Sequence, residues 1–85
     1  MKKCVAVFRS RTQVMSFIEI MNAQGIPAKA VPTPKEARVG CGLSAEIPVT
    51  SVNVAAVIVK RYGLNAFYSF LVIEKRGTRT TIVKL

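Results

Sequence analysis

Segments with helical periodicity alternate with short apolar segments along the chain, and this order constrains the fold more than any other feature of the sequence. Residues 12–24 and 50–62 predict helices, and the first repeats apolar residues at helical spacing: Val14, Phe17, Ile18 and Met21. Segments rich in β-branched and aromatic residues predict four strands, at residues 3–8, 27–31, 43–47 and 66–74. The predicted order is therefore strand, helix, strand, strand, helix, strand.

Hydroxyl residues precede both predicted helices and can cap their first turns. Ser10 or Thr12 would cap the first helix, and Thr50 or Ser51 would cap the second. Within the first helix we also expect Met15 to pack in the core.

This order predicts an α+β fold of the ferredoxin-like, split-βαβ class (βαββαβ), with an antiparallel sheet and two helices on one face. The first and third strands are expected in the middle of that sheet. At 85 residues the chain has room for one modest core, so residues 1–85 are predicted to form a single domain. Its core would span about residues 3–75, and residues 76–85 would add a C-terminal strand or trail as a tail.

The chain is strongly basic, with thirteen Lys and Arg residues against four Glu and a net charge of +9. Such a surface attracts acidic proteins and nucleic acid, and non-specific binding of polyanions is expected. No apolar segment is long enough to span a bilayer, and the apolar stretch after the N-terminal lysines stops at Arg9, too early for a signal peptide. We therefore expect a cytoplasmic protein that binds no membrane and keeps its cysteines reduced.

The sequence has no histidine, which removes the commonest general base and the commonest metal ligand. Two cysteines without histidine cannot close a four-ligand zinc site within one chain. The four carboxylates are far apart in the sequence, and the glycines form no phosphate-binding pattern. We expect no metal and no cofactor, and a cysteine is the best candidate for any covalent chemistry.

Cys41 lies between Gly40 and Gly42 in a predicted loop, a setting that exposes backbone and permits unusual dihedral angles. Because strand directions alternate, this loop is expected at the same sheet edge as the start of the first helix. Backbone N–H groups and the helix dipole favour an anion there, so they would stabilise a nucleophilic thiolate. The polar and basic residues expected at this edge are Arg9, Ser10, Arg11, Thr12, Arg38, Lys60 and Arg61.

Cys4 lies inside the first predicted strand, among apolar residues, and is expected to be buried and inert. Four residues of strand separate it from the edge that holds Cys41, or roughly 13 Å at about 3.3 Å per residue. A disulfide needs Cα atoms within about 7 Å of each other, so we predict that the two cysteines are not bonded.

The stretch "PTPKEARVGCGLSAE", residues 32–46, resembles the central signature of a small bacterial domain family described as putative selenium/sulfur carrier-like, once known only as a domain of unknown function. The matching positions are Pro32, Pro34, Lys35, Glu36, Cys41 and Gly42. The first strand leading to Ser10, the helix after it and the "GIP" before the second strand are also similar. The resemblance covers about residues 3–75.

Two positions depart from the family pattern. Val39 and Gly40 stand where serines often precede the cysteine, and Arg11 and Thr12 stand where histidine is common near the helix start. The missing serine hydroxyls cannot hydrogen-bond the sulfur in this chain.

The resemblance implies a carrier rather than an enzyme with turnover. Cys41 would accept a sulfur or selenium atom as a persulfide or selenosulfide from a donor such as a cysteine desulfurase, and would hand it to an acceptor protein. A carrier needs no histidine, because the donor enzyme can supply the proton transfers. The supporting residues would be Gly40, Gly42, Arg9, Ser10, Arg11, Thr12, Pro34, Lys35 and Arg38.

Two other functions fit a small basic domain of this kind. One is a nucleic-acid or polyanion-binding module, although the aromatic Lys/Arg-Gly-Phe signature of RNA-binding sheets is absent from the sequence. The other is a small regulatory domain that binds a metabolite, which the same fold often supports. A homodimer is compatible with all three functions, and a thiol assay would separate the carrier from the other two.

Overall fold

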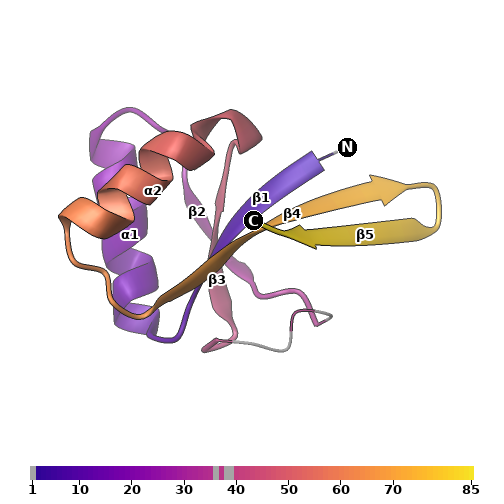
Figure 1. Ribbon diagram of the computed structural model, residues 1–85, viewed down its shortest axis with the longest axis horizontal. Coiled ribbons are helices and arrows are strands. Elements are labelled where there is room, and N and C mark those ends of the chain that lie inside the picture. Colours follow the sequence, from indigo (N-terminus) through magenta and orange to yellow (C-terminus); the bar gives the residue numbers. More distant parts are fainter. Residues whose placement is uncertain (1, 36, 38–39) are drawn as a thin grey trace.

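The protein is described here by a computed structural model that covers residues 2–35, 37 and 40–85 (Figure 1). The elements follow in the order β1 (Lys2–Phe8), α1 (Arg11–Ala23), β2 (Lys29–Pro32), β3 (Leu43–Ile47), the 3-10 turn η1 (Val49–Ser51), α2 (Val52–Arg61), β4 (Phe67–Arg76) and β5 (Arg79–Lys84). The longest dimension of the molecule is 37 Å. Figure 1 shows the β4–β5 hairpin extending away from the two helices.

Within the described residues, five strands form one antiparallel sheet in the order β2-β3-β1-β4-β5. This sheet and the two helices confirm the predicted α+β class. The four-stranded βαββαβ prediction is not matched exactly, because β5 pairs with β4 and adds a strand. The centre of the sheet is therefore β1, which lies between β3 and β4. The last residues of the chain form a paired strand rather than a tail.

Alternate side chains of β1 enter two different apolar clusters. Cys4, Ala6 and Phe8 pack with residues of both helices, so α1 and α2 share one core on one face of the sheet. Val5 and Val7 pack on the opposite face, in a smaller cluster whose other members are Leu71, Val31, Ala37, Tyr68, Ile73 and Ile82. The five residues Cys4–Phe8 are all buried. Each buried Val or Phe among them contributes about 1.5–3 kcal/mol relative to exposure.

The two helices begin differently. Ser10 caps α1, since its hydroxyl accepts a hydrogen bond from the Gln13 N–H at 3.3 Å, and Thr12 lies inside the helix. The prediction of a hydroxyl cap for α2 was wrong. Ser51 makes no capping hydrogen bond with its side chain, and the turn η1 leads into the helix instead. That turn is anchored by the Ser51 N–H, which donates to the Pro48 carbonyl at 2.9 Å.

The second strand starts later than predicted. The Ala28 N–H donates to the Asn22 side chain at 3.0 Å, so residues 27–28 close the turn after α1 and β2 begins at Lys29. At the other side of the sheet, β4 runs to Arg76, past the predicted end at Glu74, because its pairing with β5 continues to that residue.

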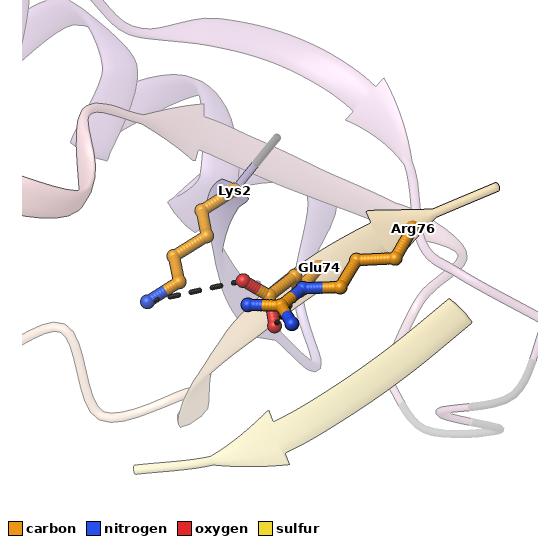
Figure 2. Close-up of polar contacts among 3 residues, drawn as sticks. All are labelled: Lys2, Glu74 and Arg76. Carbon is orange, nitrogen blue, oxygen red and sulfur yellow. Dashed lines mark ion pairs between the residues drawn. The ribbon is translucent and has the colours of Figure 1, made fainter. Parts of the chain in front are cut away.

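An ion-pair network joins β1 to β4. The Glu74 carboxylate lies 4.0 Å from Lys2 Nζ and 3.6 Å from Arg76 Nε, and Figure 2 shows it between the two basic side chains. Exposed pairs of this kind contribute at most about 1 kcal/mol. Their main effect is to reduce the positive charge at this end of the sheet.

One core prediction for α1 was wrong. Met21 is fully buried, but Met15 is 51% exposed. Met15 precedes Met21 by six residues, and at about 100° per residue its side chain points about 120° away from that of Met21.

We therefore expect Met21→Ala to destabilise the protein by about 2–5 kcal/mol, because it leaves a cavity in the helix-side core. The matched change Met15→Ala should cost less than about 0.5 kcal/mol. Urea unfolding followed by circular dichroism measures both values, and similar losses in the two variants would contradict this assignment of the helix face.

Candidate functional site

The loop that holds Cys41 is tied to the end of β1. The Cys41 N–H donates to the Phe8 carbonyl at 3.1 Å, and the Thr33 N–H donates to the Gly42 carbonyl at 2.9 Å across the base of the loop. Phe8 is two residues before Ser10, the cap of α1. The backbone of Cys41 therefore lies at the sheet edge where α1 begins, as the strand directions predicted.

Both flanking glycines adopt backbone angles that other residues rarely reach, but for different reasons. Gly40 has φ +81°, and a Cβ there would lie 2.5 Å from the Phe8 carbonyl oxygen and 3.0 Å from Val7 Cγ1. Gly42 has φ +86°, and a Cβ there would meet open space. Gly40 thus permits the close approach of the loop to β1, whereas Gly42 serves the turn conformation.

The Cys41 side chain is partly buried. It packs at the margin of the helix-side core, and its thiol donates to the Leu43 carbonyl with a sulfur–oxygen distance of 3.5 Å. A thiolate has no proton to donate, so deprotonation would end this hydrogen bond and leave the sulfur free to turn outward. The thiol is therefore partly exposed and makes one long hydrogen bond within its own loop.

A side chain that the sequence analysis missed joins α1 to the loop after α2. The Gln13 amide donates to Asn65 Oδ1 at 2.8 Å, and its oxygen accepts from the Ala66 N–H at 2.8 Å. The Arg9 N–H also donates to the Ala66 carbonyl at 2.8 Å. Ser10 and Gln13 have the spacing of a capping box. This spacing predicts that Gln13 lies in the first turn of the helix. It does not predict the partners of the Gln13 side chain, which are more than fifty residues away in the sequence.

Arg9, one of the basic residues expected at this edge, contacts an aromatic ring. The Arg9 guanidinium lies 5.3 Å from the centre of the Tyr68 ring, whose other cation neighbour is Lys84 Nζ at 4.7 Å. Tyr68 belongs to the helix-free face, whereas Cys41 packs on the helix side. Arg11 is exposed in the first turn of α1. Arg9 is thus engaged by an aromatic ring rather than by the thiol.

The remaining predicted residues belong to α2 and to the segment that follows β2. Lys60 and Arg61 are exposed in the last turn of α2, which leads toward residues 65–66. Pro34 and Lys35 line a groove on the helix-free face, on the other side of the sheet from the thiol. Arg38 was also predicted near the sulfur, but it lies outside the described residues, as do Glu36 of the family signature and Val39, which departs from it.

Cys4 has a different environment from Cys41. It is fully buried on the helix side of β1, and burial raises the pKa of its thiol from 9.0 to about 11. At neutral pH it therefore remains a protonated, inaccessible thiol. Both cysteines are free, which confirms that they do not form a disulfide. Among the described residues, no three His, Cys, Asp or Glu side chains gather as metal ligands.

A family model described as "Putative Se/S carrier protein-like" matches residues 3–69, which is most of the chain. The chain belongs to this family, so the resemblance drawn from residues 32–46 is confirmed. No curated protein and no solved structure gives a significant match. Within the described residues, no helix is both long and apolar enough to cross a membrane. The hairpin strand β5 lies beyond the matched residues.

The two glycines beside Cys41 give a test of the loop geometry. Gly42→Ala should cost about 1–2 kcal/mol from the left-handed backbone angle. Gly40→Ala should cost more, about 2–5 kcal/mol, because its Cβ would also clash with β1. Chemical unfolding of the two variants measures the difference, and equal losses would show that the contact with Phe8 does not constrain the loop.

Proposed function

We propose that this protein carries sulfur or selenium on Cys41, as a persulfide or selenosulfide, and passes the atom to an acceptor protein in the reducing cytoplasm. The observation that supports this most directly is the placement of Cys41. Its backbone is fixed to β1 and flanked by glycines, while its thiol is at the edge of the core, in a member of the Se/S carrier-like family.

The proposed loading step is an exchange between sulfur atoms. The Cys41 thiolate attacks the terminal sulfur of a donor cysteine persulfide, a new S–S bond forms on Cys41, and the donor cysteine leaves as a thiolate. Delivery repeats the step in reverse, with Cys41 as the leaving thiolate and an acceptor nucleophile taking the atom. No external oxidant is needed, because the transferred atom already has its oxidation state in the donor persulfide.

The surroundings of Cys41 support this chemistry in three ways. Gly40 and Gly42 leave backbone rather than side chains beside the sulfur, so a partner protein can approach. The first turn of α1, with Ser10 and Thr12, presents N–H groups and a positive dipole end at the same edge. Exposed Arg11 adds positive charge there.

Loading of the full chain with a cysteine desulfurase and cysteine tests this proposal. We expect intact mass spectrometry to show a gain of one sulfur atom that is reversed by dithiothreitol. The gain should persist in Cys4→Ala and disappear in Cys41→Ser, because burial keeps Cys4 protonated and inaccessible. Circular dichroism of both variants provides the control for folding. A sulfur adduct on Cys4, or none on a folded wild-type chain, would contradict the assignment.

A charge reversal at the same edge tests how the donor docks. Arg11→Glu should slow loading by about three- to tenfold at low salt, because electrostatic attraction to an acidic donor surface raises the association rate. Arg11 is preferred to Arg9, whose change would also break the contact with Tyr68. Arg79→Glu, on the far hairpin, is the matched control and should have little effect.

The slower loading of Arg11→Glu should approach the wild-type rate in concentrated salt, where screening shortens the range of charge interactions to about 3 Å at 1 M. If Arg79→Glu slowed loading equally, the cause would be the change in net charge rather than the loss of a docking contact. Tight, sequence-selective binding of an oligonucleotide at physiological salt would instead favour a nucleic-acid-binding module.

A further inference from the structure

A groove on the helix-free face lies on the other side of the sheet from the Cys41 thiol. Its volume is about 460 Å³. The lining includes aliphatic residues of three strands and lysines at the rim: Val5, Val31, Ile73, Lys3, Lys35 and Lys75. Val31 and Ile73 are partly buried and the three lysines are exposed, so the groove presents apolar surface between positive charges.

Among the described residues that line this groove, lysines outnumber carboxylates. Among the lining residues that the structure describes, Glu46 is the one carboxylate. It already lies 3.8 Å from Lys3 Nζ and 3.7 Å from Lys29 Nζ. Lys35 and Lys75 are therefore the rim charges with the greatest capacity for an external anion.

We propose that this groove binds an extended acidic segment of a partner protein, with aliphatic side chains on the groove floor and carboxylates on the rim lysines. Charge argues against a second copy of this chain as the occupant, because each copy has a net charge of +9 and only four Glu. Single-stranded nucleic acid fits less well, because its bases bind on aromatic stacking surfaces and none of the described lining residues is aromatic.

The groove and the Cys41 loop share a segment of chain. Pro34 and Lys35 belong to the family signature and line the groove. They are also the first residues of the loop whose base is joined by the hydrogen bond from the Thr33 N–H to the Gly42 carbonyl. A partner segment in the groove would thus contact the same loop that holds the sulfur. Use of the groove by a sulfur donor or acceptor rests on the proposed carrier function, whereas binding of an acidic peptide there does not.

A titration with defined peptides tests the site in the full chain. The probe is the acetylated and amidated peptide EVEIEVE, and the matched probe ESESESE keeps its charge but lacks aliphatic side chains. In 15N–1H spectra we expect EVEIEVE to shift the amides of β1, β2 and β4 that line the groove, and ESESESE to bind at least about tenfold more weakly.

Single charge reversals locate the binding surface. Lys35→Glu and Lys75→Glu should each weaken EVEIEVE binding by about three- to tenfold, because each replaces an attraction with a repulsion. Lys60→Glu makes the same change in charge on α2, which packs on the other face of the sheet, and should leave binding within about twofold of wild type. The Cys41→Ser variant should bind the peptide as wild type does, even if sulfur loading fails, so the two proposals are judged separately.

Three outcomes would overturn the proposal. Equal binding of the two peptides would show general charge attraction rather than a groove with an apolar floor. An equal loss in Lys60→Glu would place the peptide elsewhere. Tighter binding of an oligothymidylate, with shifts of the same amides, would assign the groove to nucleic acid.

Discussion

The position of the candidate sulfur atom depends on the close contact between the Cys41 loop and the last residues of β1. The Cys41 N–H binds the Phe8 carbonyl, and Gly40 approaches the same carbonyl so closely that a Cβ would not fit. Phe8 is itself fully buried against Phe17 and Phe67, with ring centres 5.3 and 5.5 Å away. The loop is thus attached to a fully buried, tightly packed residue of the central strand, which fixes the backbone of Cys41.

The central strand separates two kinds of surface. On one side the helices cover Cys4, Ala6 and Phe8, and on the other a smaller apolar cluster surrounds Val5 and Val7. The thiol of Cys41 packs on the first side, whereas the groove with its rim lysines lies on the second. One loop connects the two, so chemistry at the edge and docking on the open face could be performed by different parts of one short segment.

The two thiols show how strongly the environment determines cysteine chemistry. Cys4 is surrounded by core residues, and the loss of solvent raises its pKa to about 11, so the protonated form dominates at neutral pH. Cys41 keeps contact with solvent and makes a weak hydrogen bond to a carbonyl of its own loop. Under the proposed carrier function, burial of Cys4 would prevent it from competing with Cys41 for the donor sulfur.

The sequence by itself determined the α+β class, the positions of both helices and the burial of Cys4, because these follow from the periodicity of the apolar residues. It also determined the family, through one short signature that contains Cys41 and its neighbouring glycines. Tertiary structure decided what depends on contacts between distant residues. It paired β5 with β4, directed Gln13 to residues 65–66, engaged Arg9 with Tyr68, and placed Pro34 and Lys35 on the opposite face from the thiol. Local patterns record which residues prefer a helix, a strand or a turn. The partners of a long side chain depend instead on which strands become neighbours, and that is settled only when the sheet is assembled.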